Sequence, residues 1–164
     1  MTSITAPVLR FRLAAPADAP RLIELINTAF AVETFLEGTR TDPERLAAMM
    51  EKGSILLAED GDGRLAASVY MAMRGERGRY LGMLAVDPVL QGRGLGREMV
   101  EAAEERFRAQ GCETVEITVL SLRPELPPLY RKLGYAETGV EDFKPSVPLK
   151  DGMACHCIVM SKTL

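Results

Sequence analysis

A short glycine-rich stretch in the middle of the chain has the residue types and spacing of an anion-binding loop. It runs Gln91, Gly92, Arg93, Gly94, Leu95, Gly96 and Arg97. An apolar run at 80–86 precedes it and an amphipathic run at 97–109 follows, which predicts a strand that turns into a helix. The first N–H groups of a helix have no intrahelical acceptor, and glycine lets a phosphate come close to them. We therefore predict a pyrophosphate-binding loop.

Residue spacing excludes two common classes of protein with such a loop, P-loop proteins and Rossmann domains. A P-loop needs Lys and then Ser or Thr after its last glycine, whereas Arg97 and Glu98 follow Gly96. A Rossmann fingerprint needs a glycine at the sixth position counted from Gly92, and Arg97 stands there. A Rossmann loop also follows the first strand of its domain, whereas several predicted strands precede this one.

The elements that must position the loop alternate along the whole chain. Apolar and β-branched patterns predict strands at 8–13, 54–59, 64–73, 79–86, 112–120, 135–140 and 153–162. Helical spacing predicts helices at 18–30, from Asp42 to about Met50, at 97–109 and at 124–133. The turn signal at 60–63 joins two strands as a hairpin. A helix separates the strands at 79–86 and 112–120, so these two should be parallel.

Composition limits the class of protein. The 164 residues are 47% hydrophobic and 26% charged, typical of one soluble domain spanning 1–164. The net charge of −3 gives no basic surface for nucleic acid. Residues 1–7 lack the layout of a signal peptide, and no apolar run approaches the roughly 20 residues of a membrane span, so we expect a cytoplasmic protein without membrane contact. Three cysteines do not suggest a disulfide framework.

A wider pattern surrounds the loop. Gln91, Gly94 and Gly96 fit Gln/Arg-x-x-Gly-x-Gly, with Leu84-Ala85-Val86 before it and Leu-Tyr-x-x-Leu-Gly-Tyr at 129–135 after the next strand. This combination resembles the GNAT superfamily of N-acetyltransferases over nearly the whole chain. The resemblance implies an α/β (α+β) fold, with a mixed, mostly antiparallel central sheet of six to seven strands, helices on both faces and a V-shaped opening.

The resemblance implies acetyl-coenzyme A (acetyl-CoA) as co-substrate and assigns its binding residues. The backbone of the strand segment Leu84, Ala85 and Val86 would face the pantetheine arm, and the backbone amides of 92–97 would hold the pyrophosphate. The side chains of Gln91, Arg93 and Arg97 either contact phosphate or lie on a solvated surface. Glu125 stands where many members have an asparagine that contacts pantetheine.

The reaction implied is direct attack of a neutral amine on the thioester. Tyr130 occupies the position of the general acid that protonates the leaving thiolate, although a tyrosine there can also simply pack on the sheet. Tyr80 stands where many members have a glutamate base. The base therefore stays open between Tyr80 acting through water, Glu33, Glu37, Glu76 and an amine that arrives unprotonated.

Three further features concern the acceptor and metals. Glu33 and Glu37 fall in an irregular segment that borders the acceptor pocket in the family, where they either attract a cationic amine or form a solvated loop. Phe35 and Leu36 beside them either close over substrate or anchor the loop. In Cys155-His156-Cys157 the histidine points away from both cysteines along a strand, so no metal site is expected.

The sequence thus predicts acetyl transfer to a primary amine on a small molecule or peptide. The alternative is a module that binds acetyl-CoA as a sensor and transfers nothing. Dimers are common in such folds, and the last strands would be the contact if one forms.

Overall fold

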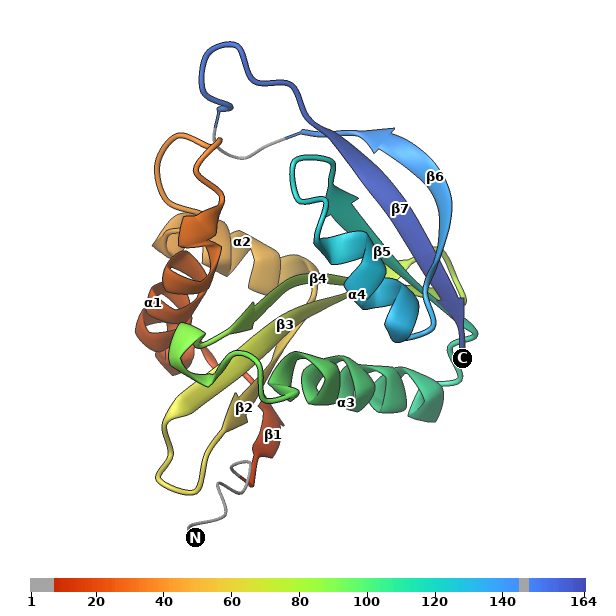
Figure 1. The fold of residues 1–164 in the computed structure, drawn as a ribbon. Helices are drawn as coiled ribbons and strands as arrows, with labels where there is room; N and C mark the ends of the chain where they lie inside the picture. The colour runs from red at the N-terminus through yellow and green to blue at the C-terminus, as the bar shows by residue number, and fades with distance from the viewer. Residues whose placement is uncertain (1–7, 145–147) are drawn as a thin grey trace, which may run out of the picture.

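The chain forms one seven-stranded sheet in the computed structural model, which describes residues 8–144 and 148–164. The strand order is β1-β2-β3-β4-β5-β7-β6, and every neighbouring pair is antiparallel except β4 and β5 (Figure 1). The strands are β1 (Arg10–Leu13), β2 (Ser54–Glu59), β3 (Leu65–Arg74), β4 (Gly78–Val86), β5 (Thr114–Leu120), β6 (Ala136–Asp142) and β7 (His156–Thr163). The predicted mixed, mostly antiparallel sheet is confirmed. The expectation about a signal peptide concerns residues 1–7, which lie outside the described part.

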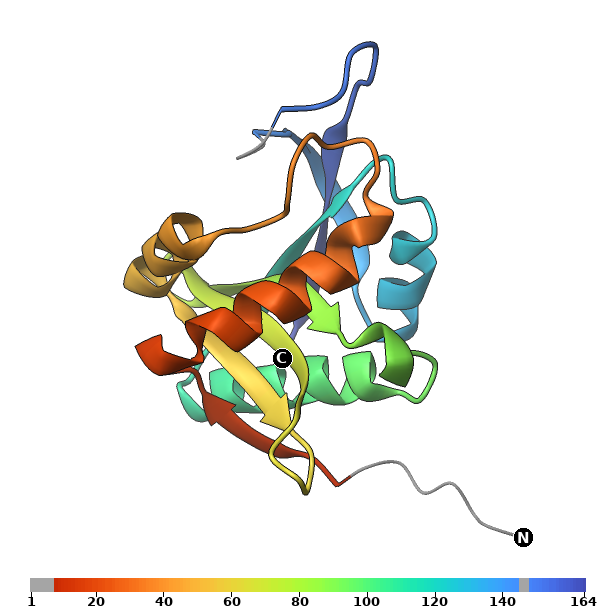
Figure 2. The same ribbon diagram turned by 90° about the vertical axis from the view of Figure 1, so that its left-hand side faces the viewer.

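Helices cover both faces of the sheet, as predicted (Figure 2). They are α1 (Ala19–Ala29), α2 (Pro43–Lys52), α3 (Leu95–Ala109) and α4 (Leu126–Lys132), with 3₁₀ turns η1 (Pro16–Asp18), η2 (Phe30–Val32) and η3 (Pro88–Leu90). Strand β2 shows how one sequence serves two cores: Ile55 and Leu57 pack under α1 and α2, whereas Leu56 and Ala58 pack against α3. Successive side chains of a strand point to opposite faces, so a continuous apolar run is needed here.

Most element boundaries differ by one to three residues from the predicted ones, and two of these differences have a clear local reason. Helix α3 begins at Leu95 rather than at 97, because Gly94 adopts a left-handed φ of 80° and acts as the N-cap. Helix α4 begins at Leu126 rather than at 124, and its first turn contains Pro127, which is accepted there because the N–H it lacks has no helical partner.

The central strands β4 and β5 separate halfway along their length. They pair only from Gly78 with Thr114 to Leu81 with Ile117. Beyond that point β4 continues beside β3, whereas β5 continues beside β7. A bulge in β4 accompanies the split, and Met83 there has a φ of 49°. Residues 82–86 therefore present a β-strand edge that no described strand covers.

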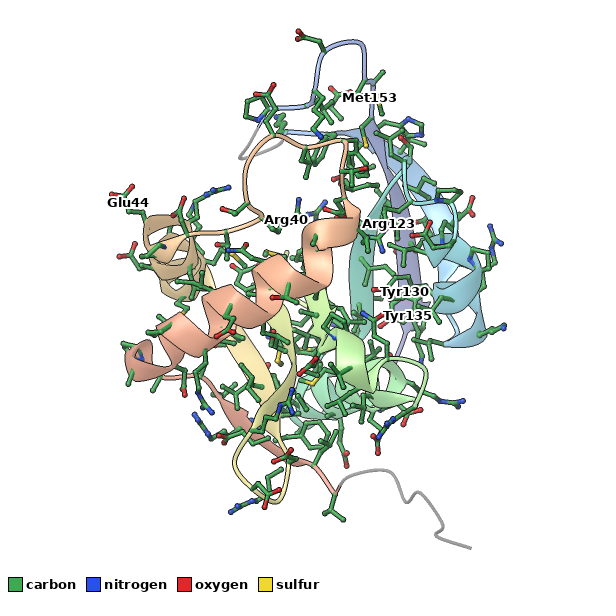
Figure 3. All side chains as sticks on the ribbon, turned by 60° about the vertical axis from the view of Figure 1, so that its left-hand side comes forward. Arg40, Glu44, Arg123, Tyr130, Tyr135 and Met153 are labelled. Atoms are coloured by element: carbon green, nitrogen blue, oxygen red, sulfur yellow. The ribbon has the colours of Figure 1, made fainter. Side chains whose placement is uncertain are left out.

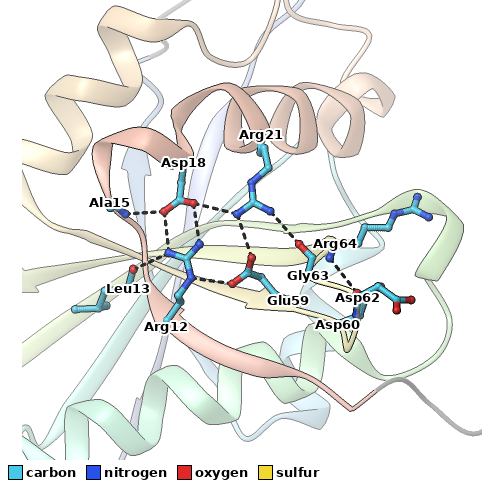
Figure 4. A network of polar contacts seen from close by, with 10 residues as sticks. All are labelled: Arg12, Leu13, Ala15, Asp18, Arg21, Glu59, Asp60, Asp62, Gly63 and Arg64. Carbon is cyan, nitrogen blue, oxygen red and sulfur yellow. Dashed lines mark hydrogen bonds and ion pairs between the residues drawn. The ribbon is translucent and has the colours of Figure 1, made fainter.

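An ionic network fixes the start of the chain to the sheet (Figure 4). Both terminal nitrogens of Arg12 donate to the Asp18 carboxylate at 2.8 Å, and Arg12 Nε donates to Glu59 at 2.8 Å. Arg21 bonds the same two carboxylates. Because the four residues come from β1, η1, α1 and β2, the network holds α1 against the sheet and thereby sets where the segment after α1 begins.

A second polar group is fully buried between α3 and the C-terminal strands. Glu104 accepts from Tyr135 Oη at 3.0 Å and from Lys162 Nζ at 3.0 Å, and Lys162 also donates to the Leu133 carbonyl. A buried carboxylate is tolerated only with such partners. The group therefore ties the end of α4 and the start of β6 to α3.

Candidate functional site

The separation of β4 and β5 opens a cleft of about 620 Å³. Its lining comes from β4 and β5, the loop at 91–97, the start of α3, α4 and the segment after α1. One end, which we call the arginine end, is lined by Phe30, Glu33, Arg40 and Arg123. The opposite end is the glycine loop. The cleft thus joins the predicted loop to the segment predicted to border the acceptor.

The glycine loop is shaped by two left-handed residues and leaves its amides available. Gly92 and Gly94 have φ values of 81° and 80°, which residues with a Cβ adopt at a cost. No described residue accepts a hydrogen bond from the backbone N–H groups of 92–97, and the first bond of the helix runs from Glu98 to Gly94. These amides, with the positive end of the α3 dipole, have the arrangement that suits an anion.

Helix α3 and strand β4 approach each other closely at Gly96. A Cβ placed there would lie 3.7 Å from Leu84 Cδ2 and 3.8 Å from Val86 Cγ2. Leu84 and Val86 both line the cleft, whereas Ala85 between them points to the other face and is fully buried under α1. The backbone of all three residues lies on the uncovered edge of β4, but only two side chains can touch a ligand in the cleft.

The polar side chains of the loop take different positions. Gln91 and Arg97 line the cleft, and Arg97 Nε also bonds Glu101 one helical turn away at 2.9 Å. Arg93 is exposed and does not line the cleft. Arg97 is therefore the better placed of the two arginines to reach an anion at the loop amides.

Tyr130 projects from α4 into the middle of the cleft (Figure 3). Its ring meets that of Tyr135 edge-on, with centroids 6.0 Å apart. Burial is the main reason that the pKa of Tyr130 is raised to about 12. The nearby Tyr80 also raises this pKa, and Arg123 lowers it. No described residue hydrogen-bonds its hydroxyl group. Tyr130 thus holds a proton at neutral pH and is free to give it to a group in the cleft.

Tyr80 crosses from β4 to β5 just before the strands part. Its hydroxyl lies 2.8 Å from Thr118 Oγ1, and the guanidinium of Arg74 stacks over its ring at 5.7 Å. Tyr80 and Thr118 both line the cleft. The predicted general-base position is therefore inside the cleft, with its hydroxyl bonded to another hydroxyl rather than to a stronger base.

Glu33 lies inside the arginine end and not on a solvated loop. Its side chain is 3% exposed, and Oε2 accepts from Arg123 Nη1 at 2.8 Å. Among the described lining residues it is the only carboxylate. This pairing was not predictable from the sequence, because Arg123 is 90 positions away in the chain.

Three other residues from the sequence analysis lie outside the cleft lining. Glu37 is exposed, and so is Glu125, which accepts from Arg123 Nε at 2.6 Å at the rim. Glu76 is exposed in the turn before β4. Phe35 and Leu36 are buried against Leu120 and Cys157, so they anchor the loop rather than close over a ligand.

The Cys155-His156-Cys157 triplet lies only partly in a strand, because β7 begins at His156 rather than at the predicted residue 153. Cys157 is buried, and His156 is exposed. Burial raises the pKa of the Cys157 thiol, which lines the cleft. Over residues 8–144 and 148–164 there is no group of three or more His, Cys, Asp or Glu side chains placed to hold a metal ion. None of the described helices is long and apolar enough to cross a membrane.

Comparison with known proteins shows relatives that are acetyltransferases. Over 85 residues the chain is 35% identical to a mycothiol acetyltransferase of Beutenbergia cavernae, covering 52% of this chain and 29% of that protein. The chain thus spans about a third of the length of the mycothiol acetyltransferases it matches. It is 28% identical over 138 residues to the S-alkylcysteine N-acetyltransferase of Bacillus subtilis, covering 76% of this chain and 77% of that protein.

Solved structures share the fold. A Bacillus subtilis acetyltransferase in complex with CoA superposes with a TM-score of 0.72 and 20% identity, covering 96% of this chain and 99% of that one. The model of the GNAT acetyltransferase domain matches residues 25–150, which include every lining residue of the cleft except Cys157. The chain therefore belongs to the GNAT acetyltransferase family.

Proposed function

We propose that this protein transfers the acetyl group of acetyl-CoA to a primary amine bound at the arginine end of the cleft. The observation that carries the proposal is the continuous cleft from the glycine loop to Glu33, with Tyr130 between its two ends. The loop amides suit a pyrophosphate, and the uncovered edge of β4 suits the amide-bearing pantetheine arm. The described residues therefore fit acetyl-CoA at one end and leave the other end for an acceptor.

The roles of the chain's own residues follow from this placement. Acetyl-CoA, when bound, supplies an acetyl group activated as a thioester. The amides of 92–97 hold its pyrophosphate, and Arg97 and Gln91 support them. The backbone of residues 84–86 orients the pantetheine arm and offers N–H donors to a developing oxyanion. Tyr130 donates the proton of its hydroxyl to the leaving sulfur.

The removal of the amine's proton is assigned to Glu33 in this proposal. It is the only carboxylate among the described lining residues, and one of its oxygens accepts no hydrogen bond from them. Tyr80 has a hydroxyl partner and remains a positioning residue in this scheme. The curated relative from Bacillus subtilis acts, by its name, on an S-alkylcysteine. An amine of this size is compatible with the cleft. We also propose that the reaction takes place in the cytoplasm.

The test combines binding with turnover. Calorimetric titration should show acetyl-CoA binding, and a thiol-detecting assay should show CoA released when a panel of amines is added. Tight acetyl-CoA binding with no thiol release from any amine would replace the enzyme by the sensor alternative. No binding of acetyl-CoA would remove both.

A further inference from the structure

The arginine end contains a buried carboxylate oxygen with no hydrogen-bond donor. Arg123 satisfies Glu33 Oε2 at 2.8 Å, but Oε1 receives no hydrogen bond from any described residue, and Arg40 Nη1 remains 3.6 Å from it. Leaving a buried acceptor unsatisfied costs free energy. Because Glu33 lines the cleft, a donor on a bound molecule can reach Oε1.

Of the two arginines at this end, Arg40 is the one that still has donors to offer. Its guanidinium stacks over the Phe30 ring at 5.1 Å and makes no hydrogen bond to the residues the structure describes. Arg123, by contrast, is engaged by two carboxylates, Glu33 and Glu125. The side chain of Arg40 is 21% exposed and lines the cleft. A guanidinium in this state is suited to bind a carboxylate through two parallel N–H donors.

The charges at this end leave room for an anion. Arg40 and Arg123 face Glu33 and Glu125, and the exposed Lys144, next to Phe143, also lines the cleft. An acceptor that carried only an ammonium group would bring a further cation close to Arg40. A zwitterion adds no net charge, and it gives Arg40 an anion and Glu33 Oε1 a donor at the same time.

We propose that the acceptor is an α-amino acid, or a derivative that keeps both the free α-amine and the free α-carboxylate. Arg40 binds the carboxylate, and Glu33 Oε1 accepts a hydrogen bond from the ammonium group. Because Oε1 and Arg40 Nη1 are only 3.6 Å apart, groups on one α-carbon can contact both. Leu120, Phe143 and Cys157 line the adjoining wall of the cleft and suit an apolar side chain.

This inference rests on the proposed acetyl transfer, and its products are an N-acetyl amino acid and CoA. The amine nitrogen forms a bond to the acetyl carbon while the thioester C–S bond breaks. The nitrogen of the ammonium group loses two protons in total. One is released to solvent through Glu33, and the other restores the proton that Tyr130 has given to the CoA sulfur.

The experiment compares acceptors that differ only at the carboxylate. L-phenylalanine, L-phenylalaninamide and 2-phenylethylamine are each assayed for CoA release, and the same series is repeated for L-leucine and L-methionine. We expect kcat/KM for the acid to exceed that for its amide and its amine by about 10- to 100-fold. The amide is a stringent comparison, because its amine is less basic than that of the free amino acid and therefore loses its proton more readily. It also represents the N-terminus of a peptide.

Variants of the two binding residues separate the two contacts. Arg40→Gln should raise KM for the amino acid by about 10- to 100-fold and lower the preference for the acid over 2-phenylethylamine, measured as the ratio of their kcat/KM values, by a similar factor, whereas Arg40→Lys should restore part of that preference. Glu33→Gln should lower activity on both acceptors alike. Arg77→Gln, at an exposed arginine in the turn before β4, is the matched control. It should not change kcat/KM for the amino acid or for 2-phenylethylamine. Thermal melting of each variant shows whether the fold is intact.

The outcomes distinguish the inference from the function on which it rests. Equal or better use of 2-phenylethylamine or the amide, by a protein that does release CoA, overturns the amino-acid assignment and leaves acetyl transfer standing. A folded Arg40→Gln variant that loses activity equally on all three acceptors also overturns it. CoA release with none of the series, and with no other amine, overturns the assignment together with the proposed function.

Discussion

At the scale of single residues, the cleft contains two tyrosine hydroxyls in different surroundings. Tyr80 Oη is bonded to Thr118 at 2.8 Å, whereas the hydroxyl of Tyr130 has no described partner. A hydroxyl that is already bonded has to break that contact before it can serve a ligand. Tyr130 is therefore the residue whose proton is available, and Tyr80 is held as part of the wall.

Replacing Tyr130 by phenylalanine tests this difference. Tyr130→Phe keeps the ring against Tyr135 and removes only the proton donor, so kcat should fall about 10- to 1,000-fold while acetyl-CoA affinity changes little. Tyr80→Phe is the comparison variant and should have a smaller effect on kcat. Steady-state kinetics and calorimetric titration measure the two quantities. Wild-type kcat in Tyr130→Phe would remove this residue from the mechanism.

The pKa of Tyr130 predicts the shape of the pH profile. Since burial raises that pKa to about 12, the hydroxyl keeps its proton well above the pH at which an ordinary tyrosine loses it. Deprotonation of Tyr130 should therefore cause no loss of kcat between about pH 8 and about pH 10. The profile is measured with a saturating amine. A loss of kcat within this interval in the wild type, but not in Tyr130→Phe, would contradict the assignment.

The sequence identified the tyrosine but not the charges around the acceptor. Tyr130 was found because a local motif surrounds it. No such motif surrounds Arg40 or Arg123. Glu33 and Arg40 lie in the segment between η2 and α2, and the fold brings this segment to Arg123 in the loop between β5 and α4. Glu33 accordingly could not be distinguished from a solvated loop residue before the fold was known.

At the scale of elements, the approach of α3 to β4 depends on a glycine. A side chain at Gly96 would enter the space beside Leu84 and Val86, where the cleft begins. Gly96→Val should weaken acetyl-CoA binding at least about tenfold, because the larger side chain fills the gap meant for the ligand. Gly61→Val, in the open hairpin turn, is the control and should leave affinity unchanged. Titration measures affinity, and an unchanged value in Gly96→Val would sink the assignment of this contact.

Most elements were predictable because their signals are local. The hairpin at 60–63, the strand 54–59 and the parallel pairing of β4 with β5 all follow from neighbouring residues or from an intervening helix. The bulge at Met83 was not predictable. A methionine with a φ of 49° has no sequence signature, and it is held there by β3 on one side while β5 departs on the other.

At the scale of the whole molecule, an ionic network joins β1, η1 and α1 to β2. Its members are Arg12, Asp18, Arg21 and Glu59. Asp18→Asn removes the charge that both arginines bind, and its side chain is only 9% exposed. We expect a loss of about 2 kcal/mol in the free energy of unfolding at neutral pH. Asp62→Asn, exposed in the hairpin turn, should change it by less than about 0.5 kcal/mol. Urea unfolding measures both variants.

The same network predicts the direction of the pH dependence. Arg12 holds the pKa of Asp18 well below its ordinary value, so the network stabilises the fold above that ordinary value and loses this contribution as the pH falls below it. The difference in unfolding free energy between wild type and Asp18→Asn should therefore shrink between about pH 5 and about pH 2. A difference that stayed constant over this range would mean that the charge of Asp18 is not what stabilises the fold.

The uncovered edge of β4 also couples the ligand supply to the lifetime of the protein. A ligand that pairs with residues 82–86 binds only the folded chain, so at a concentration about 100 times its dissociation constant it adds about 2.7 kcal/mol to stability. It also masks a strand edge that can otherwise associate with a second chain. Under the proposed binding of acetyl-CoA, the abundance of this protein in a cell should rise and fall with the acetyl-CoA pool, so the metabolic state of the cell would help to determine how much of the protein survives proteolysis.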